Sequence, residues 1–135
     1  MTLITDLLRP EAIRLELGER KKKKVIHELA KLLEAAGLEE TDTLAKQALK
    51  REKMASTGIG HGIAIPHVFS ENLEQTYMAF ARSTTGVPFD AADNRPAHLF
   101  FFLAGPSGSS AQHLKLLSKL SRLVTEKTFR EKLMQ

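Results

Sequence analysis

The chain has no cysteine and no tryptophan among its 135 residues, and it has only one tyrosine. Without cysteine, a disulfide framework, a thiolate zinc site, an iron–sulfur cluster and a cysteine nucleophile are all excluded. The shortage of tryptophan and tyrosine leaves few platforms on which nucleic-acid bases can stack.

Long apolar segments are missing as well. No window approaches the ~18 uncharged apolar residues expected of a membrane-spanning helix. Residues 1–6 (MTLITD) lack the basic start and following apolar stretch of a signal peptide. We therefore expect a cytoplasmic protein that neither spans a membrane nor is exported by that route.

The charge of the chain is modest. A formal net charge of +4 and a pI near 9.5 do not by themselves indicate a nucleic-acid-binding protein. Residues 20–24 (RKKKK) are consecutive cations at the start of a predicted helix, where the helix dipole disfavours positive charge. We expect them to form a solvated face, the alternative being a salt-sensitive docking patch for an acidic partner or nucleic acid.

Composition and periodicity predict one α/β domain over residues 1–135. The strand expected over residues 97–104 (AHLFFFLA) is apolar on both faces apart from His98. A strand without alternation lies inside a sheet that helices cover on both sides. The other expected elements are a short helix around residues 5–8, a half-buried strand over 13–17, helices over 25–36, from 41 and from 109, a strand over 76–82 and a last helix over 129–134.

Capping signals mark the expected helix ends. They are Gly37 at a C-terminus, Thr41 or Asp42 at an N-terminus, and two capping boxes, Ser109 with Gln112 and Thr128 with Glu131.

Residues 56–62 (STGIGHG) hold three of the eight glycines and are predicted to form a loop with no regular element. Small residues allow the backbone N–H groups near Gly58, Gly60 and Gly62 to approach an anion such as phosphate. The alternative is a turn that needs glycine only for its dihedral angles and that happens to precede His67.

The positions of the histidines indicate a function for some of them and not for others. His27 flanks an apolar helix stripe and is assigned none, and His98 marks a strand edge or a satisfied buried imidazole. His67 follows Pro66, which fixes the backbone that enters it. His113 lies on an apolar stripe in the first turn of a helix, where a lone histidine is usually structural but can also donate to a phosphoryl oxygen. Phosphohistidine chemistry would use such a pair, one as nucleophile and one to stabilise charge.

Neither a metal ion nor a cofactor is expected. His61 and His67 do not have the i, i+4 spacing of common zinc motifs, and no carboxylate lies between them. A P-loop lysine and a dinucleotide fingerprint are also absent.

Residues 51–67 (REKMASTGIGHGIAIPH) resemble the active-site signature of the type-2 enzyme IIA domains of the bacterial phosphotransferase system, the fructose/mannitol and nitrogen-regulatory family. Similarity continues through residues 86–90, 103–106 and 112–123, so it covers nearly the whole chain. The resemblance implies a mixed β-sheet flanked by helices on both faces. Two departures are Val68 and Phe69, which stand where the family prefers a very small residue, and the end at Gln135, short of the last helix of many members. Either the domain is naturally short or its C-terminal end is incomplete.

The resemblance also implies a function. His67 would accept a phosphoryl group from a histidine-containing phosphocarrier protein and pass it to a IIB domain for fructose-type uptake. His113 matches the family's second histidine, and Arg51 and Ser56 match polar residues beside the phosphorylation site. The alternative is a nitrogen-regulatory signalling protein in which phospho-His67 controls binding to transporters, kinases or regulators. We expect no nucleic-acid partner, although residues 20–24 leave such a module as a third alternative, and the oligomeric state stays open.

Overall fold

A computed structural model describes residues 8–135, apart from the side chains of residues 8, 9, 109 and 110. Its elements are β1 (Leu8–Arg14), α2 (Lys22–Leu32), α3 (Thr41–Met54), β2 (Gly58–Gly60), β3 (Ile63–Ala64), β4 (His67–Ser70), β5 (Tyr77–Val87), β6 (Ala97–Pro106), α4 (Ser110–Val124) and α5 (Lys127–Leu133). Short 3-10 turns follow α2 (Leu33–Ala36) and precede α4 (Ser107–Ser109). Within residues 8–135, no helix is both long and apolar enough to cross a membrane.

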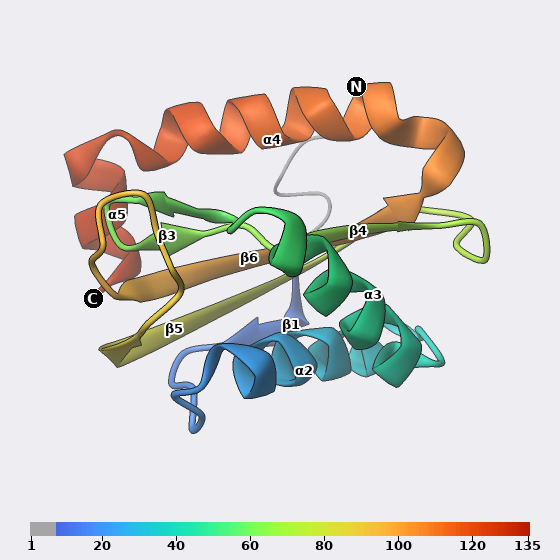
Figure 1. Cartoon of the computed structure of the whole chain (residues 1–135), viewed down its shortest axis with the longest axis horizontal. Coiled ribbons are helices and arrows are strands. Elements are labelled where there is room, and N and C mark those ends of the chain that lie inside the picture. The colour runs from blue at the N-terminus through green and yellow to red at the C-terminus, as the bar shows by residue number, and fades with distance from the viewer. Residues whose placement is uncertain (1–7) are drawn as a thin grey trace.

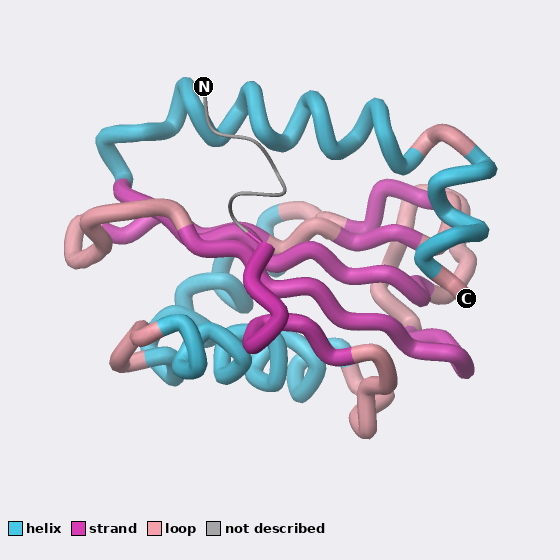
Figure 2. Tube along the Cα trace, turned by 180° about the vertical axis from the view of Figure 1, so that it is seen from behind, coloured by secondary structure: helices cyan, strands magenta, loops and turns pink. Residues whose placement is uncertain are grey.

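The strands form one mixed sheet, which confirms the predicted fold class (Figure 2). The strand order is β1-β5-β6-β3-β2, and β4 also pairs with β6, beyond the end of β3. The β1–β5, β3–β6 and β4–β6 pairs are parallel, whereas β5–β6 and β2–β3 are antiparallel. β6 therefore lies in the centre, with β5 on one side and the β3–β4 segment on the other.

Helices cover both faces of this sheet, as the apolar strand predicts (Figure 1). α2 and α3 lie on one face, where Phe100 and Phe102 of β6 join their hydrophobic cluster. α4 lies on the opposite face, where Phe101 and Leu103 pack with its Leu116 and with neighbouring apolar residues. Successive residues of β6 thus enter two separate clusters because side chains alternate along a strand.

The first long helix agrees with the apolar pattern that predicts it. Val25, Ile26 and Leu29 are buried, and the following 3-10 turn ends at Gly37. Gly37 has a φ of 95°, the left-handed conformation that terminates many helices.

Two of the predicted N-terminal caps are wrong. α3 is preceded by Glu40, which makes no side-chain capping bond, while the Thr41 hydroxyl donates to Glu34 at 2.8 Å. α5 begins at Lys127, so Thr128 lies inside the helix instead of capping it. The capping box at residue 109 concerns a side chain outside those described.

The strand predicted over residues 13–17 is also wrong in its bounds and its buried face. β1 ends at Arg14, and Ile13 and Leu15 are exposed, whereas Ala12 and Leu17 are buried. Within residues 8–135, β1 pairs with β5 alone and at a shifted register, and the regular pairing ends at Arg14, after which the Leu17 N–H still donates to the Arg82 carbonyl of β5 at 2.8 Å. The helix expected around residues 5–8 lies outside the described residues, except for Leu8, which begins β1.

The glycine-rich segment is a β-hairpin, which corrects the prediction of a loop without regular structure. β2 and β3 pair with Gly60 opposite Ile63, so His61 and Gly62 form a two-residue turn. Both turn residues have positive φ, 57° and 76°, as a type I′ hairpin turn requires. Gly60 and Gly62, both with positive φ, therefore serve the backbone geometry of the hairpin directly.

Candidate active site

His67 is the first residue of β4 and lies opposite Leu103 of β6. Side chains alternate along β4, so His67 and Phe69 share one face while Val68 points to the other. Val68 is buried in the cluster of α2 and α3, and Phe69 contacts His113 of α4. The strand thus presents a half-buried His67 on the face that α4 covers.

One nitrogen of the His67 ring is already engaged. Its Nδ1 lies 3.0 Å from the carbonyl oxygen of Ile65. A carbonyl oxygen can only accept a hydrogen bond, so Nδ1 carries the proton. In the neutral ring the lone pair is then on Nε2. The sequence did not identify the acceptor of this bond.

His113 is fully buried, as its position on the apolar stripe predicts. Its Nε2 lies 2.9 Å from the hydroxyl of Thr76, and its Nδ1 is buried without a partner within residues 8–135. A Cβ atom on Gly105 would overlap the His113 ring, so this strand glycine makes room for the imidazole. Buried polar atoms are nearly always paired in folded proteins, so the unpaired Nδ1 of His113 is an unusual feature of this site.

The structure brings the two histidines to the same face of the sheet. The Phe69 ring has its centroid 6.1 Å from that of His67 and 4.8 Å from that of His113. Phe69, which departs from the family's very small residue, therefore packs beside both imidazoles.

Burial lowers the pKa of His113, and positive charge on His67 lowers it further. Both effects disfavour the charged ring. His113 is consequently neutral at neutral pH, with one nitrogen able to donate and one able to accept.

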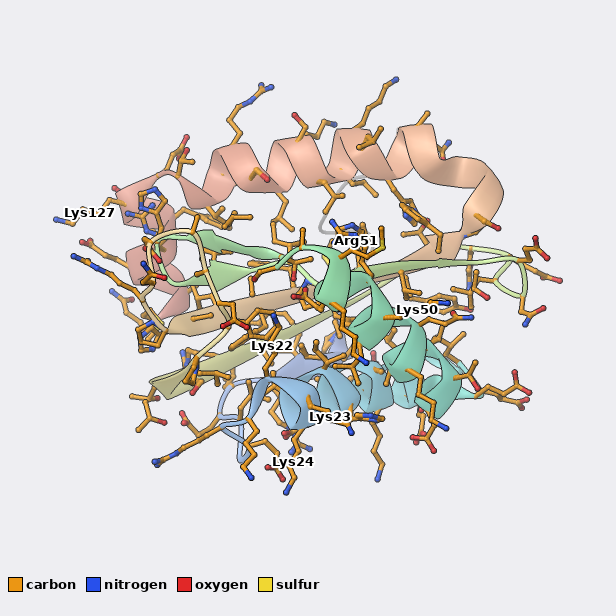
Figure 3. The ribbon with its side chains drawn as sticks, in the orientation of Figure 1. Lys22, Lys23, Lys24, Lys50, Arg51 and Lys127 are labelled. Atoms are coloured by element: carbon orange, nitrogen blue, oxygen red, sulfur yellow. The ribbon has the colours of Figure 1, made fainter. Side chains whose placement is uncertain are left out.

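Arg51 lies in the last turn of α3, the helix that packs beside β4 (Figure 3). Its guanidinium donates to the Ala55 carbonyl at 2.9 Å, the one acceptor that it has within residues 8–135. The side chain is half-buried, so the remaining donors of its planar fork are free to bind an anion.

Ser56 and Gly58 belong to a different contact. The Ser56 hydroxyl donates to the Phe89 carbonyl at 2.6 Å and accepts from the Gly58 N–H at 3.0 Å. Gly58 packs against Ala91 so closely that a Cβ atom would lie 3.0 Å from its backbone. These residues fasten the start of the hairpin to the segment before β6.

The hairpin turn does not lie beside His67. The Gly62 carbonyl accepts from the N–H of Leu99, whereas His67 lies opposite Leu103. Four residues of strand separate these positions, about 13 Å at 3.3 Å per residue. Gly60 and Gly62 are therefore far from the imidazole that they were expected to serve.

The remaining histidines stay outside the site. His98 Nδ1 lies 2.8 Å from the Ser83 carbonyl, which fits the interpretation of a satisfied imidazole near a strand edge. His61 is exposed in the hairpin turn, and its backbone N–H donates to Asp93 at 3.1 Å.

The solvated face expected for residues 20–24 is wrong for one residue, Lys22. Its Nζ lies 2.8 Å from the buried carboxylate of Glu52 and 4.7 Å from the centroid of the Phe89 ring. Lys22 lies on the side of α2 nearer the sheet, while Lys24 extends away from it (Figure 3). Glu52 was missed, although its i+4 spacing from Ala48 puts an acid on the apolar stripe of α3.

Comparisons with known proteins identify the family to which this chain is similar. Residues 6–135 match the family model described as "Phosphoenolpyruvate-dependent sugar phosphotransferase system, EIIA 2". A nitrogen regulatory protein of Bradyrhizobium diazoefficiens is 39% identical over 131 residues, 96% of this chain and 85% of its own length. A crystal structure of the nitrogen regulatory protein IIA-Ntr from Neisseria meningitidis superposes with a TM-score of 0.93 at 36% identity, covering 99% of this chain and 92% of that chain.

A fructose-specific relative is much longer. The fructose-specific EIIABC component of Bacillus subtilis is 38% identical over 133 residues, which is 98% of this chain and 21% of that protein. The similarity therefore extends to both the sugar-specific and the nitrogen-regulatory branches. Since the family model spans nearly the whole sequence, the chain belongs to the EIIA type 2 family of the phosphoenolpyruvate-dependent sugar phosphotransferase system.

Proposed function

We propose that His67 is the phosphoryl acceptor of this EIIA protein. A histidine-containing phosphocarrier protein supplies the phosphoryl group, and a IIB domain removes it as a step in fructose-type sugar uptake. The reaction takes place in the cytoplasm and needs no metal ion or cofactor.

The hydrogen bond from His67 Nδ1 to the Ile65 carbonyl carries this proposal. It fixes the tautomer in which Nε2 is unprotonated, the state that a nucleophile requires. It also stabilises the ring after attack, because a phosphorylated imidazole that keeps its Nδ1–H carries positive charge.

The phosphoryl group moves from one imidazole to another. Nε2 of His67 forms the new bond to phosphorus while the N–P bond of the donor phosphohistidine breaks. The electron pair of that bond returns to the donor ring, and no proton needs to leave His67. Phosphoryl transfer has a loose transition state, so the protein acts by positioning and by stabilising charge on the phosphoryl oxygens.

Two further side chains are assigned to those oxygens. The unpartnered Nδ1 of His113 is a donor in the tautomer in which the Thr76 hydroxyl donates to Nε2. The guanidinium of Arg51 offers a planar fork suited to phosphate. Ser56 and Gly58 are assigned an indirect role through the backbone that precedes His67, and Gly60 and Gly62 a role in the hairpin turn.

A second candidate function differs in what happens to the phosphoryl group after it reaches His67. Similarity to nitrogen regulatory proteins over most of their length favours a signalling role, in which phospho-His67 changes the surface offered to a transporter, kinase or regulator. Both candidates use the same acceptor, and they differ in whether a IIB domain takes the group.

Incubation with labelled phosphoenolpyruvate, enzyme I and the phosphocarrier tests the shared step. We expect label on the wild-type chain and none on His67→Ala. His61→Asn is the matched control, because His61 lies in the exposed hairpin turn and asparagine tolerates its positive φ. Label that persists on His67→Ala contradicts the assignment.

A second incubation separates the two fates. The isolated phosphoprotein is mixed with a fructose-type IIB domain, and loss of its label to that domain supports the uptake role. Retention of label, together with state-dependent capture of a transporter or kinase, supports the signalling role.

A further inference from the structure

A chain of hydrogen bonds connects a buried ion pair to the ring of His67. It begins at Lys22 and Glu52, passes through Thr57 and Ile65, and ends at the His67 Nδ1–H.

Of the two charged residues in this series of hydrogen bonds, Glu52 is the more deeply buried. Its side chain is 3% exposed, and Lys22 neutralises it at 2.8 Å. One carboxylate oxygen accepts from the Thr57 hydroxyl, and both oxygens lie 3.1 Å from the Thr57 N–H. Glu52 therefore holds both donors of Thr57, on its backbone and its side chain.

Thr57 passes this constraint to the strand that bears the catalytic histidine. Its carbonyl accepts from the Ile65 N–H at 3.1 Å, and the Ile65 carbonyl accepts from His67 Nδ1 at 3.0 Å. Pro66 has no N–H, so Ile65 provides the donor that anchors this segment on the side of Thr57. On the other side, the Pro66 carbonyl accepts from Leu103 of β6 at 3.0 Å.

Stability alone does not account for a charged pair at this place. A buried carboxylate loses its hydration, and apolar side chains of similar volume are often as stable or more stable. A carboxylate does what an apolar group cannot, because it orients two donors of one residue and so fixes a peptide plane. That peptide joins Ser56 to Thr57, and Thr57, held at both its N–H and its hydroxyl, presents its own carbonyl to the Ile65 N–H.

We propose that Glu52 is a positioning residue for His67. With Lys22 as its counter-ion, it fixes Thr57 and Ile65 so that the Ile65 carbonyl holds the proton of His67 on Nδ1 and leaves Nε2 free. The inference rests on the proposed function of His67 as phosphoryl acceptor. Glu52 does not touch the phosphoryl group and acts only through this hydrogen-bond chain.

Nitrogen-15 NMR of the His67 ring tests the proposal directly, because the two tautomers give different shifts for Nδ1 and Nε2. The measurement uses the unphosphorylated full chain at a pH where His67 is neutral. In the wild type we expect the Nδ1–H form to predominate. In Glu52→Gln we expect a mixture of both tautomers and a rate of phosphorylation by the phosphocarrier about tenfold lower, the effect of weakening one charged hydrogen bond.

Two further variants keep the test independent of the folding of Glu52→Gln. Thr57→Val removes the hydroxyl that donates to Glu52 and keeps the Thr57 carbonyl, so it should shift the tautomers in the same direction by less. Lys22→Met removes the counter-ion and keeps the aliphatic stem. Circular dichroism identifies the variants that are folded, and only those enter the comparison.

Matched controls separate positioning from general loss of stability. Thr41→Val removes a different buried hydroxyl, at the start of α3, which donates to Glu34 and takes no part in this series of hydrogen bonds. Lys23→Met neutralises the exposed neighbour of Lys22 on α2. Either control can lower the melting temperature, but neither should change the tautomers of His67.

The outcomes distinguish this inference from the proposed function. If the ratio of tautomers is the same as in the wild type in every folded variant of Glu52 and Thr57, Glu52 is not a positioning residue, even when His67 is phosphorylated normally. If the wild type takes up no phosphoryl group, the proposed function fails, while the NMR comparison still decides whether Glu52 holds the ring.

Discussion

At the scale of single residues, the site contains two imidazoles in different environments. His67 is half-buried, with Nδ1 bound to a backbone carbonyl, whereas His113 is fully buried beside Phe69. Burial and hydrogen bonding therefore support the proposed division of roles, in which His67 accepts the phosphoryl group and His113 stabilises its charge.

His113→Ala should slow phosphorylation or onward transfer by about 10²–10³, the effect typical of losing one donor that stabilises charge in the transition state. Single-turnover transfer of label from the phosphocarrier measures the rate. An unchanged rate would remove His113 from the reaction and leave it a structural residue.

The lowered pKa of His113 makes stability depend on pH. Burial first, and charge on His67 second, lower the pKa from its ordinary 6.5, so between the folded and unfolded pKa values the unfolded chain binds more protons. We expect the contribution of His113 to the free energy of unfolding to be complete above pH 6.5. It should decrease as the pH drops through this value toward the folded pKa.

Urea unfolding between about pH 7.5 and about pH 5 measures this effect. His113→Gln should flatten the dependence in that range, and His27→Gln on α2 should leave it in place. Glu16 and Asp93, whose pKa values are lowered from 4.5 and 3.8, titrate below the range. An equally steep fall in His113→Gln would assign the dependence to another group.

At the scale of elements, the site depends on how closely α4 approaches the end of β6. Phe69 of β4 lies opposite Gly105, and the His113 ring occupies the space that a Gly105 side chain would fill. Gly105 therefore takes part in the pairing of β4 with β6 and also lies against the His113 ring of α4.

Gly105→Ala should displace the His113 ring and destabilise the protein by about 1–3 kcal/mol, as overpacking does in a filled core. It should also slow transfer without changing His67. Gly108→Ala is the control, because no atom lies within 4 Å of the added Cβ.

A double variant tests whether the clash is the cause. His113→Ala removes the ring, so adding Gly105→Ala to it should be less damaging than adding Gly105→Ala to the wild type, a coupling that a double-mutant cycle measures. Additive effects would indicate that Gly105 acts through the backbone of β6 instead.

At the scale of the whole molecule, the protein is a mixed sheet between two helical layers. Phe101 and Phe102 are neighbours in β6, are 2% and 0% exposed, and belong to different clusters. One strand thus joins the layer that carries His113 to the layer that carries Glu52.

Phe101→Ala and Phe102→Ala should each destabilise the protein by about 3–5 kcal/mol, because each leaves a cavity in a filled core. Urea unfolding at neutral pH measures both. A change within about 0.5 kcal/mol in either variant, typical of surface positions, would contradict the covering of both faces.

The sequence alone determined the features that local physics controls. The unbroken apolar run of β6 required cover on both faces, the stripe with Val25 and Leu29 together with Gly37 set the course and end of a helix, and residues 51–67 carried the family resemblance. It failed for the bounds of β1 and for the N-terminal caps of α3 and α5.

Only the tertiary structure decided the partners of the candidate site. It separated the glycine turn from His67, placed the Ile65 carbonyl against Nδ1, and turned Lys22 inward to the buried Glu52. Nothing in a run of cations tells which one is buried, because that depends on the orientation of α2 against α3. Burial and pairing arise between elements distant in the chain, and such contacts follow from the packing of the whole molecule.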